Sequence, residues 1–421
     1  MAQKEKIKKA LFESNPWWRK KLEINYKNRD IYQKLQKYID AKQIIALTGL
    51  RRVGKTTIML KIVKEKIDSG FDPDNIIYFS FDTFRDLDLS ELIEVYSSEY
   101  DKNIEDSKYI FLLDEIQKIE NWEEQVKRLY DFHTNFKIII SGSESLFVRK
   151  KSRESLAGRM FEFKIESLSF KEFLSFKGLK SKPLGLYEKE LAKAFEDFMF
   201  SGGFPELVNM KDKDFIKNYI RETVVEKVLF RDIPLIYPIR DVSILESIFK
   251  IISGNPGQII EINKLASEVG LSRRVVSLYL GYLENSYLIK RIFNFSRNQR
   301  KSAKKLKKYY PTIPALGFIY GNEDVKPKIF ENILVLQTGT NFFWRDAYKN
   351  EVDIVLDEEK KIVPIEIKYG EIKDIKGLLK FMELFDIKKG FVISKEEEKE
   401  LKVDNKKILV IPAWKWLLEE R

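Results

Sequence analysis

The stretch IIALTGLRRVGKTTIML, residues 44–60, constrains the fold more than any other part of the chain. An apolar run leads into Gly49, and the order Gly49-x-x-x-x-Gly54-Lys55-Thr56 fits a phosphate-binding loop between a strand and a helix. Glycines let backbone N–H groups curl around phosphate oxygens, and the helix N-terminus adds a favourable dipole. The stretch therefore predicts a nucleotide-binding α/β domain. The alternative is an ordinary strand–turn–helix.

In such a loop, Lys55 neutralises phosphate charge and Thr56 ligates magnesium, so ATP and Mg2+ are the predicted cofactors. The residues predicted to bind them are Gly49, Arg52, Val53, Gly54, Lys55, Thr56, Thr57 and Asp114.

Two later strands support this prediction. YIFLLDEIQKIENW, from Tyr109, is an apolar run that ends in Asp114-Glu115. We expect Asp114 to hold magnesium through water and Glu115 to polarise the attacking water. FKIIISGSESLF ends its apolar run at Ser141-Gly142-Ser143, where a polar side chain is placed to contact the γ-phosphate. The alternative there is a simple polar turn.

Positive charge is concentrated in one region. Residues 261–310 hold twelve Lys and Arg and three acids, a net +9 out of +11 for the whole chain. Such a patch attracts polyanions, although a solvated lysine face is the alternative.

A helix-turn-helix pattern lies inside the basic region. QIIEINKLASEVGLSRRVVSLYL reads as a helix, a turn at Gly270 and a second helix, and a wing-like strand follows. Arg273 and Arg274 open the second helix, and the basic tract 297–308 contains Lys304 and Lys305. These four residues predict binding to double-stranded or branched DNA. A role in packing or protein contact is the alternative.

The C-terminal stretch EVDIVLDEEKKIVPIEIKYG, residues 351–370, places carboxylates on two predicted strands, 352–356 and 362–368. Asp353 lies on the first, Glu366 and Lys368 face the same way on the second, and Glu331 lies on a helix predicted over 328–336. Converging carboxylates bind magnesium, and a neighbouring lysine can activate water. We therefore expect a metal site at Asp353 and Glu366 with Lys368 beside it.

With these motifs the chain resembles the archaeal and bacterial predicted ATPases of the AAA+ superfamily that end in a restriction-endonuclease-like domain. The resemblance covers roughly residues 15–370. It rests on GLRRVGKTT from Gly49, LLDEIQKIENW, IIISGSESL, LAGRMFEF, SFKEFL, SGGFPELV and FFWRDAYKNEVDIVL…PIEIK.

The resemblance implies an α/β fold with four parts. These are a P-loop RecA-like core with an N-terminal linker (1–165), a helical lid (166–240), a winged helix-turn-helix with the basic tract (241–310) and a PD-(D/E)xK nuclease-like domain (311–421). It implies that Ser143 or Ser141 is the sensor 1 residue. It also implies that Arg159 reaches a γ-phosphate in cis or from a neighbour, and that NPWW, residues 15–18, packs near the base. Two core tryptophans are the alternative for NPWW.

The expected function is an ATP-hydrolysing enzyme that acts on DNA, with metal-dependent cleavage left open because no glutamine follows Lys368 in the place where the nuclease motif often has one. The alternative is a nucleotide-switched DNA-binding or signalling ATPase with a non-catalytic C-terminal domain. There are no cysteines, no signal-like start and no 18-residue apolar stretch. A cytoplasmic protein without membrane contact is expected, and a homo-oligomer is left open.

Overall fold

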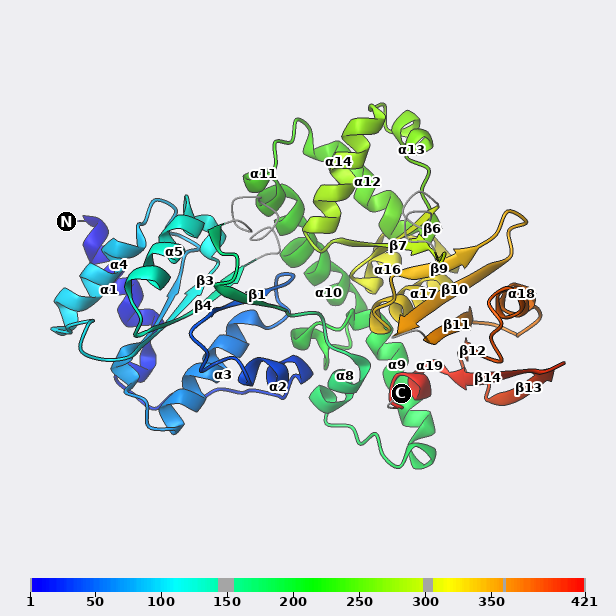
Figure 1. Cartoon of the computed structure of the whole chain (residues 1–421), viewed down its shortest axis with the longest axis horizontal. Helices are drawn as coiled ribbons and strands as arrows, with labels where there is room; N and C mark the ends of the chain where they lie inside the picture. The colour runs from blue at the N-terminus through cyan, green and yellow to red at the C-terminus, as the bar shows by residue number, and fades with distance from the viewer. Residues whose placement is uncertain (1, 143–154, 298–305, 359–360, 420–421) are drawn as a thin grey trace. The chain divides into compact units, whose positions relative to one another are not determined.

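The computed structural model of the chain describes residues 2–142, 155–297, 306–358 and 361–419 (Figure 1). The chain divides into two compact units, Met1–Glu166 and Ser167–Arg421. None of the described helices is long and apolar enough to cross a membrane.

The first unit contains a parallel sheet with the order β2-β3-β4-β1-β5. Its strands are β1 (Ile44–Thr48), β2 (Ile76–Ser80), β3 (Tyr109–Asp114), β4 (Phe136–Gly142) and β5 (Met160–Lys164). β1 and β3 are buried along their whole length, which explains why their sequences are continuous apolar runs rather than alternating ones.

Helices cover both faces of this sheet. They are α1 (Ala2–Ser14), α2 (Asp30–Gln36), α3 (Lys55–Asp68), α4 (Leu89–Tyr100) and α5 (Trp122–Phe132), with short 3-10 turns η1 (Pro16–Trp18), η2 (Pro73–Asn75) and η3 (Ile116–Lys118). α1, α4 and α5 share one hydrophobic cluster with the strands, and α1 lies beside α4 (Figure 1). α3 contacts β4.

The strand order decides which side chains meet. β4 lies between β1 and β3, so Ser141 near the end of β4 sits between the loop after β1 and Asp114 at the end of β3. All three strands point the same way, and their carboxyl ends therefore form one edge where a ligand would bind.

The second unit is richer in helices. It contains α8 (Phe170–Lys177), α9 (Glu188–Ser201), α10 (Lys213–Asn218), the π-helices η6 (Tyr219–Val225) and η7 (Val228–Asp232), α11 (Ile233–Ile236), α12 (Val242–Gly254), α13 (Ile262–Glu268), α14 (Arg273–Asn285), α16 (Gly317–Tyr320), α17 (Lys326–Gln337), α18 (Lys376–Leu384) and α19 (Ala413–Trp416). Its 3-10 turns are η4 (Leu184–Leu186), η5 (Pro205–Leu207), η8 (Pro314–Leu316) and η9 (Glu323–Val325).

A nine-stranded mixed sheet runs through this unit in the order β13-β14-β12-β11-β10-β9-β7-β8-β6. The strands are β6 (Gln258–Ile259), β7 (Ile289–Asn294), β8 (Lys307–Pro311), β9 (Phe342–Arg345), β10 (Glu351–Glu358), β11 (Lys361–Lys368), β12 (Lys389–Ser394), β13 (Lys399–Val403) and β14 (Lys406–Pro412). β10 carries a register shift against β9 between Val352 and Val355, which is the signature of a bulge.

Two hydrophobic clusters cover the faces of this sheet. One joins Ile354, Ile365 and Ile393 to helices α8, α9, α17 and α19. The other joins Val352 and Val392 to α18. Figure 1 shows α18 beside the strands β10 and β11.

The predicted boundary between residues 310 and 311 falls inside β8. β8 pairs with β6 and β7, and β7 pairs in parallel with β9, so the strands on the two sides of this boundary belong to one sheet. The helix and strands predicted between 328 and 368 are present as α17, β10 and β11, with ends that extend a few residues further.

Candidate functional site

The loop after β1 has the backbone that a phosphate-binding loop needs. Gly49, Arg52 and Gly54 have φ angles of 143°, 64° and 101°, in the left-handed region. A Cβ on Gly49 would lie 2.2 Å from the carbonyl oxygen of Ile165, which follows β5. Only glycine fits at this position, because the loop is packed against backbone.

Arg29 fixes the loop from outside. Its Nη1 donates to the carbonyl oxygen of Val53 at 2.8 Å and its Nη2 to that of Glu166 at 2.7 Å. The side chain is buried. Arg29 therefore ties the second half of the loop to the chain that follows β5.

Lys55 opens α3 and folds back over the loop. Its Nζ donates to the carbonyl oxygens of Gly49 at 3.0 Å and Leu50 at 2.9 Å, and the residue is buried. These contacts hold the ammonium at the mouth of the loop, where a phosphate oxygen is a stronger partner than a carbonyl. Thr56 and Thr57 follow it on the exposed side of the first turn of α3.

Asp114 at the end of β3 is the centre of the site. Its Oδ2 accepts hydrogen bonds from the hydroxyls of Thr56 at 2.7 Å and Tyr78 at 2.8 Å, and its Oδ1 accepts one from Ser141. Burial, and then the charge of Asp114, raise the pKa of the Tyr78 hydroxyl. The structure thus brings together the predicted residues Thr56, Asp114 and Ser141, and adds Tyr78.

These residues fit a magnesium ion. Thr56 and Asp114 offer a hydroxyl and a carboxylate, which are hard oxygen donors, beside the loop that would hold the phosphates. Thr56 and Asp114 are the residues that would hold such an ion, which would offset phosphate charge.

Glu115 is half-buried and follows Asp114 in a left-handed conformation, with a φ angle of 56°. Its Oε2 accepts a hydrogen bond of 2.6 Å from Nε2 of Gln117. Glu115 is thus the residue next to Asp114 in sequence, and its predicted role as a water-polarising residue stays a prediction.

Other predicted contacts lie elsewhere. Arg159 precedes β5 and its carbonyl oxygen accepts from the N–H of Ile44, the first residue of β1, at 2.8 Å. That edge is about 16 Å from the loop at ~3.3 Å per strand residue. Its guanidinium donates to Asp131, with Nε–Oδ1 at 2.9 Å. A cis contact to the nucleotide is therefore not supported, and contact with a neighbouring subunit stays a prediction.

The tryptophans of NPWW also lie at the amino-terminal edge. The indole N–H groups of Trp17 and Trp18 donate to the carbonyl oxygen of Ile76, the first residue of β2, at 3.1 and 3.0 Å. This arrangement favours the alternative that they anchor the first helices. Ser143 lies outside the described residues.

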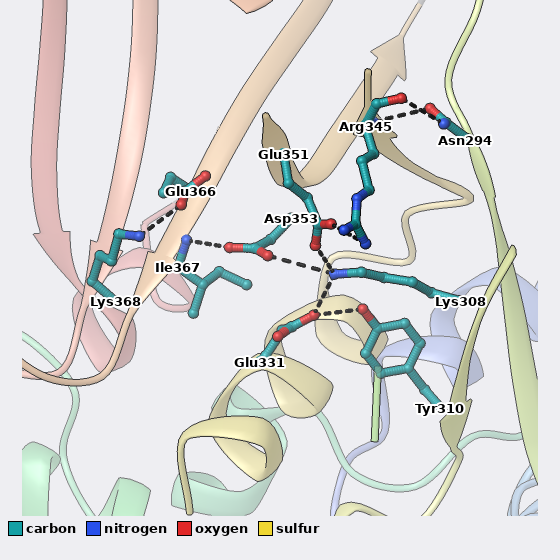
Figure 2. A network of polar contacts seen from close by, with 10 residues as sticks. All are labelled: Asn294, Lys308, Tyr310, Glu331, Arg345, Glu351, Asp353, Glu366, Ile367 and Lys368. Carbon is teal, nitrogen blue, oxygen red and sulfur yellow. Dashed lines mark hydrogen bonds and ion pairs between the residues drawn. The ribbon is translucent and has the colours of Figure 1, made fainter. Parts of the chain in front are cut away.

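In the second unit, the acidic residues gather around Lys308 of β8 (Figure 2). Its Nζ lies 2.6 Å from Oε1 of Glu351, 3.1 Å from Oε1 of Glu331 and 3.6 Å from Oδ1 of Asp353. Tyr310 donates its hydroxyl hydrogen to the same Glu331 oxygen at 2.6 Å. Lys308 was counted in the basic tract, but it is only 4% exposed, so it does not face a DNA backbone.

Asp353 lies where β10 and β11 part. The pairing of these strands ends at Ile354 and Ile365, and beyond it Oδ2 of Asp353 accepts from the N–H of Ile367 at 2.9 Å. The carboxylate thus replaces a backbone carbonyl. Burial, and then the charges of Glu366 and Glu331, raise the pKa of Asp353.

Glu366 forms an ion pair with Lys368. Nζ of Lys368 lies 2.8 Å from Oε1 of Glu366. In the parallel pairing, Glu366 is level with Val392 of the α18 cluster, while Ile365 belongs to the opposite cluster that contains α17. Burial raises the pKa of Glu366 to about 6, although Lys368 opposes this shift. Glu331 and Glu366 therefore belong to different faces of the sheet.

The arrangement around Asp353 does not fit a divalent cation. Among the described residues, no group of three or more acidic or histidine side chains has metal-binding geometry. Both oxygens of Asp353 have partners, one the N–H of Ile367 and the other the Lys308 ammonium. We derive no metal-dependent step from this arrangement.

The predicted DNA-contacting residues are partly described. Arg273 and Arg274 are exposed at the start of α14, which Ser272 caps by accepting from the N–H of Val275 at 3.4 Å. Burial, and then the charges of Arg291 and Arg273, lower the pKa of Lys307. Arg291 also pairs with Glu284, with Nη2 and Oε2 3.1 Å apart, so its charge is partly balanced within the chain. Lys304 and Lys305 lie outside the described residues.

Residues 41–174 match the family model described as an AAA domain. This part of the chain is similar to AAA-type ATPase domains. Two further models, both described as domains of unknown function, match residues 192–313 (DUF8612) and 328–416 (DUF4143). The AAA domain match supports ATPase activity, and no described function comes with the other two.

Relatives similar over nearly the whole chain are uncharacterized proteins. MJ1544 of Methanocaldococcus jannaschii is 29% identical, with 94% of this chain and 93% of the relative covered. MJ1637 of the same organism is 27% identical, with 92% and 87% covered. A protein of Haemophilus influenzae is 24% identical, with 91% and 96% covered.

Similar solved structures include Cdc6p from Pyrobaculum aerophilum, with a TM-score of 0.30, 11% identity and coverage of 74% of this chain and 97% of that one. PCH-2 of C. elegans gives a TM-score of 0.22 and 15% identity, with 40% and 42% covered. These likenesses are too distant to bear on the fold or on the function.

Several residues of both sites were not predicted. Arg29, far from the loop in sequence, carries no local signal. Tyr78 lies in the middle of β2 and donates its hydroxyl hydrogen to Asp114, but aromatic residues are common in strands. Lys308 shares one face of β8 with the buried Tyr310, but the burial of this face depends on strands that are far away in the sequence.

Proposed function

We propose that the chain binds ATP with magnesium at the loop 49–56 and hydrolyses it. The observation that carries this proposal is the convergence of Thr56, Ser141 and Tyr78 on Asp114, with Lys55 held over the loop. Three neutral hydroxyls orient the carboxylate without cancelling its charge.

Each residue has a separate task in this proposal. The loop N–H groups and Lys55 bind the phosphates, and Glu115 accepts a proton from the attacking water. A bound magnesium ion would neutralise phosphate charge. Gln117 positions Glu115 through its hydrogen bond.

The test separates binding from turnover. Glu115→Gln keeps the shape of the side chain but removes the base, so ATP affinity is expected to stay within about twofold while turnover falls about 100-fold. Glu120→Gln, on an exposed residue of the same segment, is the matched control. Wild-type turnover in the Glu115 variant would rule out the assigned role.

We further propose that the second unit binds DNA. The exposed Arg273 and Arg274 at the start of α14, and the proximity of Lys307 to Arg291 and Arg273, support this proposal. Phosphates would offset the mutual repulsion of these cations. Binding to DNA during an ATP cycle agrees with a nucleotide-switched DNA-binding ATPase.

The DNA test is a salt titration. Arg273→Ala/Arg274→Ala is expected to weaken binding to duplex and four-way DNA and to reduce the slope of log affinity against log salt by about 1–2. Lys189→Ala/Lys193→Ala removes the same charge from exposed positions of α9 and is expected to change neither. Equal effects of the two pairs would show only a general charge effect.

A metal-dependent nuclease remains a separate prediction from the sequence, at Asp353, Glu366 and Lys368. What favours it is that Asp353 and Glu366 lie on neighbouring strands and that the Glu366 carboxylate is paired with Lys368. Incubation of linear and four-way DNA with manganese, for the wild type and Asp353→Asn, tests it. Absence of Asp353-dependent cleavage supports the non-catalytic alternative.

A further inference from the structure

The acidic network of the second unit already contains a cation. Lys308 is a lysine with a 4% exposed surface, and its Nζ lies 2.6–3.6 Å from the carboxylates of Glu351, Glu331 and Asp353 (Figure 2). A buried ammonium group is tolerated only when carboxylates or dipoles compensate for its lost hydration. Here three carboxylates from two different elements do so.

The carboxylates that contact Lys308 also bind neighbouring side chains, so the lysine is one member of a connected network. Oε1 of Glu331 receives both the Lys308 ammonium and the Tyr310 hydroxyl. Glu351 is shared between Lys308 and Arg345, whose Nη1 lies 3.4 Å from Oε2. Burial acts to lower the pKa of Lys308, but the surrounding acids raise it well above the usual value, so the group stays charged.

The lysine is also held in position by the sheet. β8 pairs with β7 and β6 on its two sides, and Tyr310, two residues further on the same face, is fully buried in the cluster that contains α17. Asn294 of β7 exchanges two hydrogen bonds with the backbone of Arg345 in β9. The ammonium therefore reaches the carboxylates from a rigid strand rather than from a loop.

We propose that Lys308 takes the place of a divalent cation in this network, so that the native chain binds no metal ion at Glu331, Glu351 and Asp353. A neutral side chain at position 308 would leave Glu331 and Asp353 without the ammonium and Glu351 with Arg345 as its partner, and such a set of hard oxygen donors attracts a dication such as Mn2+ or Ca2+. The proposal goes beyond the ATPase function and does not depend on it.

The reason is competition for the same oxygens. A dication and an ammonium that both approach Glu331 and Asp353 repel each other in a poorly solvated place. The backbone of Lys308 is fixed in β8, which pairs with β6 and β7. Its ammonium therefore competes for these oxygens as an intramolecular partner. A metal ion must compete from solution.

The experiment measures Mn2+ binding to the full chain without nucleotide, by electron paramagnetic resonance of free Mn2+. All proteins carry Thr56→Ala and Asp114→Asn, so that neither residue that would hold a metal ion beside the loop remains. The parent is expected to bind no ion at the network, and Lys308→Met is expected to bind one Mn2+ per chain. Lys308→Met/Asp353→Asn is expected to lose it. Lys308→Arg, which keeps the charge, and Lys307→Met, the neighbour on the strand, should behave like the parent.

Thermal unfolding gives a second readout. Added Mn2+ is expected to raise the Tm of Lys308→Met by several degrees and to leave that of the parent unchanged, because a ligand stabilises only a state that binds it. Asp353-dependent Mn2+ binding by the parent would overturn the proposal. So would a folded Lys308→Met protein that gains no ion. If Lys308→Met does not fold, the comparison of the parent with its Asp353→Asn variant decides the matter alone.

Discussion

The two units each place an aspartate on a strand of a sheet, Asp114 buried and Asp353 half-buried, but they surround it differently. Asp114 receives hydroxyl hydrogens from Thr56, Tyr78 and Ser141. Asp353 receives a backbone N–H and the ammonium of Lys308. Hydroxyls orient a carboxylate and leave its charge available, whereas an ammonium cancels that charge. The same residue type is therefore prepared for an incoming cation in one unit and is neutralised from within the chain in the other.

The lysines of the two centres show the same contrast. Lys55 donates to two backbone carbonyl oxygens, which are weaker partners for an ammonium than phosphate. Lys308 is held by full negative charges. A nucleotide can recruit Lys55 at little cost, while nothing of similar charge is free to recruit Lys308 from Glu331 and Glu351.

The largest expected effect tests the first lysine. Lys55→Ala removes the cation that neutralises the phosphates, so ATP affinity is expected to fall at least about 100-fold. Lys64→Ala, on the exposed side of α3 where Lys64 pairs with Asp68, is the control. The measurement is titration with a fluorescent ATP analogue. If Lys55→Ala kept the ATP affinity of the wild type, the proposed difference between Lys55 and Lys308 would be wrong.

The next effect compares the aspartates directly. Asp114→Asn is expected to lower ATP turnover by about two orders of magnitude, because the neutral side chain no longer attracts a cation. Asp353→Asn is expected to leave ATP turnover unchanged, because the partners of Asp353 belong to the second unit alone. It is expected to leave DNA affinity unchanged, because Asp353 contacts Lys308 and not the exposed Arg273 and Arg274. Turnover assays and DNA titrations of both variants check this. A similar loss of turnover in both would show that the two centres are coupled.

A pair of tyrosines gives a smaller effect. Tyr310 donates to Glu331 at 2.6 Å and Tyr78 to Asp114 at 2.8 Å. Tyr310→Phe leaves a buried carboxylate with one donor fewer, and a loss of roughly 2–3 kcal/mol in unfolding free energy is expected from urea titration. Tyr78→Phe is expected to cost less stability, because Thr56 and Ser141 still bind Asp114. Equal losses of unfolding free energy in Tyr310→Phe and Tyr78→Phe would contradict the proposed difference between the Lys308 network and the Asp114 centre.

The smallest expected effect is a pH dependence. The pKa of Glu366 is raised to about 6 in the folded protein, mainly by burial, so folding favours the protonated form. Its contribution to stability is therefore present below the unfolded pKa of about 4.5 and is lost as the pH rises through 6. Between these values, the unfolding free energy of the wild type is expected to fall by roughly 1–2 kcal/mol relative to Glu366→Gln.

Asp353 belongs to the same network, and its pKa is raised in the same direction, partly by Glu366. The difference between the pH–stability profiles of the wild type and Glu366→Gln therefore reflects the titration of Glu366 together with Asp353. Glu222→Gln, on an exposed glutamate that pairs with Arg221, is the control. Parallel profiles of the wild type and Glu366→Gln between pH 4.5 and pH 6 would contradict the raised pKa.

The nucleotide site could be predicted from the sequence because its residues follow strands whose apolar runs are continuous. Once the strands at residues 44–48 and 109–114 are placed in parallel, Lys55, Thr56 and Asp114 have to meet at one edge. Ser141 follows from the same rule. Arg29 could not be predicted, because its contacts with Val53 and Glu166 depend on tertiary packing.

The second centre was only half predictable. The pattern of residues 351–368 indicated two strands with Asp353, Glu366 and Lys368 in place, and the strands are there. What the pattern could not show is that β8 enters the same sheet and brings Lys308 to Asp353 and Glu331, because pairing between strands far apart in sequence leaves no periodic signal. For that reason, the sequence places Lys308 in the basic tract that is predicted to contact DNA, with a solvated lysine face as the alternative.

The continuous nine-stranded sheet also limits how this chain can be divided. A fragment that begins at residue 311 would lose β6, β7 and most of β8, and would expose the edge of β9 that pairs with Phe293 and Asn294. Unpaired edges of this kind associate with one another, and the missing strand also carries the counter-charge of Glu331. Aggregation of such a fragment would then reflect a cut through a sheet rather than an unstable C-terminal fold. Fragments that start at residue 167 keep every strand of this sheet.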